Sequence, residues 1–425
     1  MFKILKQLFT KKNKDIRKRL YFTIAVLTIF IIGTTIEVPG TQSITKNLGF
    51  LELLNVMGGG ALKNFSIFAL GVSPYITASI IIQLLEMDII PYFSELAKQG
   101  HTGQQKLNQI TRYVGIVFAF IQGYAMSYAF LGKNFGVLGY LEVALIMTAG
   151  TAFLLWLGDQ VTQKGLGNGT SLIIMAGIIT SLPSMMKTAF STLVDFGTTK
   201  TTIVGLSAFL LFILVYILVI IGVIYIEGAE RRISIQYANK STASLGKQTY
   251  MPIKINSAGV MPVIFASSLL AVPATIAQFI NKEGFSNFVD KYLDYTKPVG
   301  FILFVVLILF FAYFYTFIQM KPDQMAKNLQ DNGGYVPGVR PGEATTKYFS
   351  QVLSRLTIVG AFFLTILAAL PILVNAFTSL PSTVSLGGTG LLIVVGVAIE
   401  TYKQLESSLL SREYSVNKNN RRARR

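Results

Sequence analysis

The chain has 425 residues, of which 52% are hydrophobic and 13% charged, and its formal net charge is +17. A soluble domain carries roughly 25% charged residues, so this composition leaves too little polar surface for a water-soluble body. There is no cysteine and a single histidine, His101, which excludes disulfides, thiol chemistry and multi-histidine metal sites. We therefore expect a membrane protein without a metal or another cofactor.

Ten apolar segments are long enough to form transmembrane helices, each of which needs roughly 20 residues. They lie at 20–36, 69–86, 113–131, 142–158, 170–186, 203–226, 257–280, 298–319, 354–375 and 386–402. Basic residues precede the first segment, but it has no small-residue cleavage site. We therefore expect it to be a retained anchor rather than a signal peptide.

Lysine and arginine are distributed unequally between the two sides of the predicted membrane. The tails 1–19 and 403–425 and the loops on their side hold 29 of the 37, and the other side holds eight. The positive-inside rule then places both termini in the cytoplasm. The basic tails are expected to set this topology and to attract anionic lipids, with docking of RNA or an acidic partner as the alternative.

Two segments of the chain resemble each other. Gly71–Ile82 (GVSPYITASIII) and Gly259–Leu270 (GVMPVIFASSLL) are identical at six of twelve positions and belong to the second span of each half. Gly169–Ile174 and Gly388–Ile393 form a weaker pair in the fifth spans. Because each half has an odd number of spans, we predict an inverted repeat with its pathway between the halves. The halves are predicted at residues 20–188 and 203–402.

Proline occurs at equivalent positions of the repeated segments. Pro74 and Pro262 are expected to interrupt the backbone hydrogen bonds of their helices. Such interruptions are tolerated in a membrane where protein or a cavity covers them. The alternative is a pair of kinked packing helices.

Phe50–Leu62 (FLELLNVMGGGAL) is apolar but too short to cross roughly 30 Å of hydrocarbon. Three glycines, Gly58 to Gly60, follow its apolar run and predict a hinge. We expect a short re-entrant helix that folds back into the molecule. A helix lying flat on the membrane surface is the alternative.

The predicted span interiors contain no acidic or basic residue, and their strongest polar groups are Gln83, Gln122 and Gln278. Ion-coupled transporters place ionisable groups at this depth, and nucleotide hydrolysis would need a phosphate-binding loop. We therefore expect neither an enzyme nor an ion-driven carrier. A secondary transporter of a small solute remains the rival hypothesis, because it can use the same inverted repeat.

Seven segments, in order along the chain, resemble the SecY family, the channel-forming subunits of protein translocases. They are Met57–Leu62, Ser66–Leu85, Trp156–Ile174, Ala258–Ser268, Tyr335–Tyr348, Arg355–Ala361 and Gly388–Glu400. The resemblance implies an all-α polytopic membrane protein with ten transmembrane helices in two inverted five-helix halves. It also implies that the re-entrant helix is a plug, formed by Phe50, Leu51, Leu53, Leu54, Val56, Met57, Gly58, Gly59 and Gly60.

The same resemblance implies a pore ring and a lateral gate. The ring would consist of Val72, Ile76, Thr170, Ile174, Ile264 and Ile393, and the gate residues would be Pro74, Ile80, Gln83, Pro262, Ser267 and Ser268. Val72 and Ile76, four residues apart, share one helix face. A ring of branched apolar side chains excludes ions by dewetting. Thr170 departs from the branched aliphatic residue that the family pattern leads us to expect.

The resemblance further implies that cytoplasmic loops 227–256 and 320–355 bind partners through Arg231, Arg232 and Arg340. Glycine and proline beside Arg340 fix its turn and present the guanidinium outward, although a purely structural arginine is the alternative. The loop tip Asn239–Gln248 is less basic than is usual in the family, so an accessory paralogue is possible and no tip contacts are predicted.

The implied function is a protein-conducting channel in the bacterial plasma membrane. It would pass unfolded secretory proteins and release transmembrane segments sideways. The expected partners are SecE-like and SecG-like small membrane subunits, a SecA-type motor ATPase, the ribosome, signal peptides and unfolded preproteins, and anionic lipids.

Overall fold

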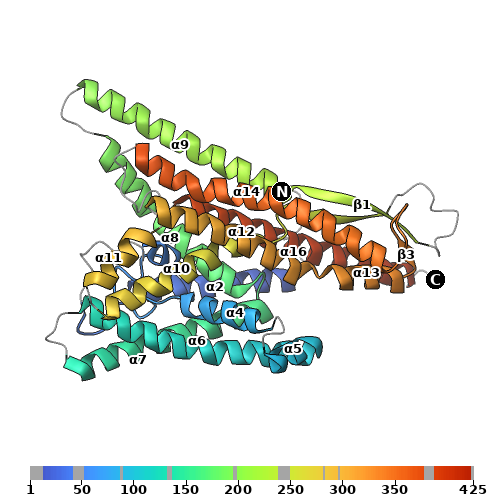
Figure 1. Cartoon of the computed structure of the whole chain (residues 1–425), viewed down its shortest axis with the longest axis horizontal. Helices are drawn as coiled ribbons and strands as arrows, with labels where there is room; N and C mark the ends of the chain where they lie inside the picture. The colour runs from blue at the N-terminus through green and yellow to red at the C-terminus, as the bar shows by residue number, and fades with distance from the viewer. Residues whose placement is uncertain are drawn as a thin grey trace.

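The computed structural model describes residues 13–41, 52–86, 90–131, 136–194, 199–237, 249–280, 283–294, 297–377 and 387–422. In these ranges the chain is mainly a bundle of helices (Figure 1). Each of the ten predicted spans lies largely on one of these helices, which confirms the predicted all-α polytopic membrane fold.

The spans of the first half lie on α2 (Lys14–Thr35), α4 (Ser73–Leu85), α6 (His101–Phe130), α7 (Gly136–Lys164) and α8 (Gly169–Leu193). Those of the second half lie on α9 (Thr199–Gly228), α10 (Met261–Ile280), α12 (Pro298–Met320), α14 (Glu343–Phe377) and α16 (Gly387–Arg422). Four shorter helices are α3 (Glu52–Met57), α5 (Pro91–Lys98), α11 (Glu283–Tyr292) and α13 (Pro322–Asp331).

Six helical segments among the described residues are long and apolar enough to cross a membrane by themselves. They belong to α6, α7, α8, α9, α12 and α14. Helix α4 is apolar but shorter, and 13 residues rise only about 20 Å. The turns before α4 extend its path, and they bond internally, for example from Ser66 N to the Ala61 carbonyl at 3.0 Å. Such pairing is what irregular backbone in a membrane requires.

The helices of the two halves pack in the same order. In the first half α4 contacts α6, α6 contacts α7, and α7 contacts α8; in the second half α10 contacts α12, α12 contacts α14, and α14 contacts α16. Likewise α2 contacts α8, and α9 contacts α16. This order agrees with a duplicated arrangement, although the limits 20–188 and 203–402 stay a prediction. The halves meet where α10 contacts α4 and α6 and where α16 contacts α8.

A small antiparallel sheet joins the two long loops of the second half. Its strands β1 (Glu230–Tyr237), β2 (Thr249–Lys254) and β3 (Gly334–Tyr335) lie in the order β2-β1-β3. Strands β1 and β2 come from loop 227–256 and β3 comes from loop 320–355, so the loops form one unit. The sheet, α5 and α13 lie at one end of the bundle and α11 lies near the other (Figure 1).

Burial explains why this unit is ordered. Alternate residues of β1, Ile233 and Ile235, are buried and pack in one apolar cluster with Phe349 and Leu353 of α14. The alternation gives β1 one buried face and one exposed face, as expected for a strand that covers a core on one side. The unit is therefore anchored on the N-terminal part of α14, a long helix that continues into the bundle.

Candidate functional site

Five of the six residues predicted for the pore ring are buried in the largest apolar cluster of the described chain. They are Val72, Ile76, Ile174, Ile264 and Ile393, each with at most 7% of its surface exposed. They come from α4 or its N-cap, α8, α10 and α16, helices that belong to both halves. The structure thus places them in one apolar core to which both halves contribute, and their role as a pore lining stays a prediction.

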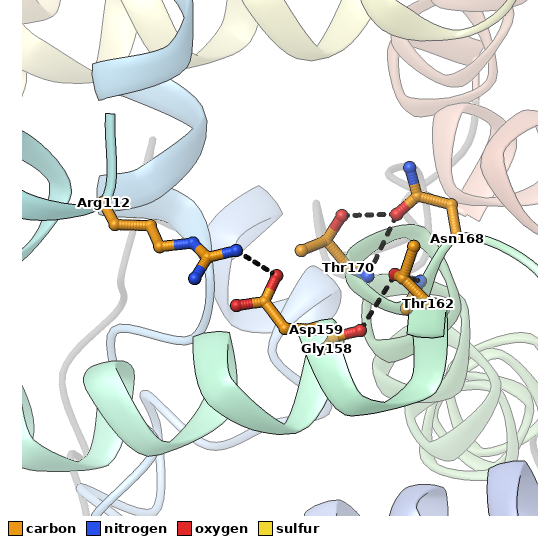
Figure 2. Close-up of polar contacts among 7 residues, drawn as sticks. Arg112, Gly158, Asp159, Thr162, Asn168 and Thr170 are labelled. Atoms are coloured by element: carbon orange, nitrogen blue, oxygen red, sulfur yellow. Dashed lines mark hydrogen bonds and ion pairs between the residues drawn. The ribbon is translucent and has the colours of Figure 1, made fainter. Parts of the chain in front are cut away.

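Thr170, the sixth predicted ring residue, has different surroundings. It lies in the first turn of α8 and is partly exposed. Asn168 is the N-cap, and its Oδ1 accepts hydrogen bonds from Thr170 Oγ1 at 2.7 Å and from the Thr170 amide at 3.1 Å (Figure 2). Asn168 is strongly favoured at this position because its side chain satisfies the free amides of a helix start. The Thr170 hydroxyl therefore belongs to a polar cap.

The Thr162 hydroxyl connects α7 to the start of α8. Thr162 Oγ1 donates to the Gly158 carbonyl at 2.9 Å and accepts from the Gly169 amide at 2.9 Å. Gly158 and Gly169 allow this approach, because a Cβ on Gly169 would overlap the backbone of Gly158. The cap and this bond together hold the start of α8 beside α7.

An ion pair that hydropathy did not predict joins the neighbouring helices α6 and α7. Arg112 Nη2 lies 2.8 Å from Asp159 Oδ1, with 42% and 27% of the two side chains exposed (Figure 2). Both residues lie one position outside the predicted spans 113–131 and 142–158, so hydropathy placed them in loops. Their helices continue past these limits and bring the charges together.

The predicted plug is a short helix that folds into the core. Helix α3 contacts α8, and Val56 and Met57 are buried in the same cluster as the ring residues. Gly58 to Gly60 form turns after α3. Of the other predicted plug residues, Leu53 and Leu54 are helical, whereas Phe50 and Leu51 lie outside the described residues.

The predicted gate residues lie on α4 and α10, which contact each other. Ile80, Ser267 and Ser268 are buried. Gln83 Nε2 donates to Ser79 Oγ at 3.1 Å, and Gln83 Oε1 is buried without a partner within the described part of the chain. The gate assignment itself stays a prediction.

One expectation about these helices is wrong. Pro74 and Pro262 do not interrupt α4 and α10, because each is the second residue of its helix. A proline in the first turn removes no intrahelical hydrogen bond, since that amide has no partner within the helix. The prolines therefore mark where the helices begin.

The three arginines predicted to bind partners are all exposed on the sheet unit. Arg232 Nε donates to Glu230 Oε1 at 3.0 Å, and this hydrogen bond raises the pKa of the Arg232 guanidinium. Its guanidinium carbon also lies 4.8 Å from the centre of the Tyr250 ring. Arg340 follows β3, and its carbonyl, rather than its side chain, holds the turn by accepting from Thr345 Oγ1 at 2.9 Å.

Comparison with known proteins decides the family. The family model SecY matches residues 66–402 of the chain. The chain is also 48% identical to the protein translocase subunit SecY of Staphylococcus epidermidis, over 97% of the chain and 99% of that protein. The chain belongs to the SecY family. The same subunit of Staphylococcus aureus is 48% identical over 95% of the chain and 96% of that protein.

Solved structures share the SecY fold. A protein-conducting channel aligns with a TM-score of 0.64 at 20% identity, covering 93% of each chain. Sec61 in the canine ribosome–channel complex aligns with a TM-score of 0.60 at 20% identity, also covering 93% of each chain. Membership of SecY makes this chain a channel subunit of a protein translocase and not an enzyme, which confirms the predicted family and function. Within the described residues, no three His, Cys, Asp or Glu side chains form a group that could hold a metal ion.

Proposed function

We propose that unfolded secretory proteins cross the membrane between α4, α8, α10 and α16 of this chain. The observation that carries this pathway is the burial of five branched apolar side chains, contributed by both halves, in one cluster. An apolar constriction excludes ions by dewetting, without needing a charge. It also presents no hydrogen-bonding groups to a passing chain, so it suits substrates of any sequence.

The proposal assigns α3 the role of a plug and α4 with α10 the role of a lateral gate. Support for the plug comes from the packing of α3 on α8 and from its buried residues Val56 and Met57. Support for the gate comes from the contact between α4 and α10, because it lies on the boundary of the two halves. Hydrophobic signal and transmembrane segments would leave between these two helices.

The sheet unit would be the docking surface for a SecA-type ATPase or the ribosome, through Arg231, Arg232 and Arg340. All three arginine residues are exposed, and the unit that carries them has its own apolar core. Arginine suits this role because its planar fork of donors binds carboxylates and phosphates in pairs. A structural neighbour is described in complex with a ribosome, which supports the second partner.

The proposed location is the bacterial plasma membrane, with both termini and the sheet unit in the cytoplasm. The excess of lysine and arginine on that side supports this orientation and a contact with anionic lipids. SecE-like and SecG-like subunits would accompany the chain. Helix α9 leaves most of its apolar surface uncovered, and lipid or such a subunit would cover it.

The pathway can be tested by site-specific crosslinking, because the chain has no natural cysteine. We expect Ile264→Cys to crosslink to a preprotein halted during translocation. The matched control is Ile221→Cys on α9, where 56% of the side chain is exposed on the outside of the bundle. A crosslink at the control and none at Ile264→Cys would refute the pathway.

A further inference from the structure

Helix α8 meets the end of α3 backbone to backbone. Gly177 of α8 lies against Met57 and Gly59, and a Cβ added at Gly177 would overlap the Met57 carbonyl oxygen. A Cβ added at Gly59 would lie only 3.2 Å from Gly177 Cα. No side chain fits between the two segments, so glycine at both positions is what permits their contact.

A hydrogen bond crosses the same contact one turn later on α8. Ser181 Oγ lies 3.1 Å from the Val56 carbonyl and 3.1 Å from the Gly177 carbonyl. The last carbonyls of a helix lack intrahelical partners, and α3 ends at Met57. The Val56 carbonyl also accepts from the Gly59 amide at 3.1 Å, so the Ser181 hydroxyl is a second donor to it, from a helix 125 positions away.

The chain after α3 has a defined conformation that matches this contact. Gly59 and Gly60 have φ values of +72° and +83°, in the region that favours glycine. The Gly60 amide donates to the Asn55 carbonyl at 2.8 Å, which is the bond that closes a Schellman helix end. The buried Asn55 side chain accepts from the Lys63 amide at 2.9 Å. The segment therefore meets α8 as a preformed turn.

We propose that Gly177 and Ser181 are positioning residues that hold the end of α3 in the closed channel. This inference rests on the proposed role of α3 as a plug. Gly177 supplies the space for close contact between α8 and the end of α3. Ser181 supplies a hydrogen bond to Val56 that fixes how far α3 can slide along α8. A side chain at 177 has to displace Met57 and Gly59 or move α8, because the atom it meets is backbone.

The test measures the plug position and the membrane seal separately, in vesicles containing the full chain with its partner subunits. Position is reported by the rate at which a maleimide modifies Met57→Cys, since Met57 is 9% exposed and the chain has no other cysteine. The seal is reported by ion leakage. We expect Gly177→Ala to raise the modification rate by about tenfold or more, as for overpacking of a core contact.

Ser181→Ala should raise the same rate by about fivefold, which corresponds to one lost hydrogen bond. Both variants should increase ion leakage. Two control variants make the same chemical changes at other positions, and in them neither the modification rate of Met57→Cys nor the ion leakage should change. Gly222→Ala adds a methyl group that meets nothing within 4 Å, and Ser184→Ala removes an exposed hydroxyl from the same helix.

Deleting residues 50–62 separates this inference from the plug proposal. If the deletion does not increase leakage, the plug proposal fails. If the deletion increases leakage but Gly177→Ala and Ser181→Ala leave both readouts unchanged, only the role of Gly177 and Ser181 is overturned. Gly177→Ala should add no leakage to the deletion, and added leakage would mean that it damages α8 instead. If the Gly177→Ala protein does not accumulate in the membrane, the two readouts of Ser181→Ala decide whether the proposed contact holds α3.

Discussion

Asn256 Nδ2 donates to Glu227 Oε1 at 2.6 Å and to the Gly259 carbonyl at 3.0 Å, and both side chains of the pair are buried. Glu227 lies in the last turn of α9, and Asn256 lies between β2 and α10. The bond therefore joins the end of one membrane helix to the start of the proposed gate helix. It also lies beside the two chain segments that lead into the sheet unit.

This pair predicts unequal effects of two substitutions. Asn256→Ala should destabilise the protein by about 1–3 kcal/mol or more, because it leaves the Glu227 carboxyl buried without this partner. Glu227→Gln should cost less, since its amide oxygen can still accept from Asn256. Thermal unfolding of the purified complex in detergent measures both.

Ser257→Ala is the matched control, because the Ser257 hydroxyl next in sequence bonds the Lys254 carbonyl and is exposed. Its transition temperature should stay within error of the unmodified protein. Equal transition temperatures for Asn256→Ala and Ser257→Ala would show that the buried bond contributes nothing measurable.

Reversing the charge at Arg340 should impair partner-driven export. Arg340→Glu keeps the turn, because Thr345 bonds the backbone carbonyl of Arg340, and changes only the exposed charge. We expect a large loss of motor-driven preprotein translocation into vesicles with normal thermal stability. Lys327→Glu reverses an exposed charge on α13 and should have little effect. Normal export by Arg340→Glu would remove it from the docking surface.

The gate proposal predicts a disulfide between α4 and α10. Ile80→Cys with Ser267→Cys places thiols at two buried positions of helices that contact each other. Oxidation should link them in the idle channel and block the release of transmembrane segments, and reduction should restore release. Ile80→Cys with Ile221→Cys on α9 should not link. Failure of every pair along α4 and α10 would contradict the gate.

The ion pair between Arg112 and Asp159 predicts a modest coupling. A double-mutant cycle with Arg112→Gln and Asp159→Asn should give about 1 kcal/mol or less, because both side chains are partly exposed. The measurement is the unfolding free energy of each variant. A coupling of zero would mean that solvent or lipid headgroups replace the pair fully.

Hydropathy and family motifs predicted the parts of the fold that depend on local composition. Each apolar segment became a helix, and the predicted ring residues Ile174, Ile264 and Ile393 lie in one core. Spacing and motif are enough here, because an apolar segment in a membrane must satisfy its own backbone. The short helix α3 was expected from the length of its segment and the glycines after it, whereas its role as a plug came from the family resemblance alone.

Two of the missed features depend on contacts between distant segments, and two others are local. Strand β3 pairs with β1 about a hundred positions away, and neither loop contains a hairpin signal for that pairing. Arg112 and Asp159 meet only because α6 and α7 extend past their apolar windows. Pro74 was misread because composition does not show at which residue a helix begins. The hydroxyl of Thr170 has its own local partner in Asn168.

The three-stranded sheet makes the proposed docking surface stiff. Strand β1 bonds β3 on one side and β2 on the other, and β2 continues through Asn256 into α10. A force applied at Tyr335 must therefore either shear strand hydrogen bonds or reach the base of α10. If a motor binds this sheet as we propose, its force reaches the start of the proposed gate helix through strand hydrogen bonds and a short stretch of chain, without a separate moving part.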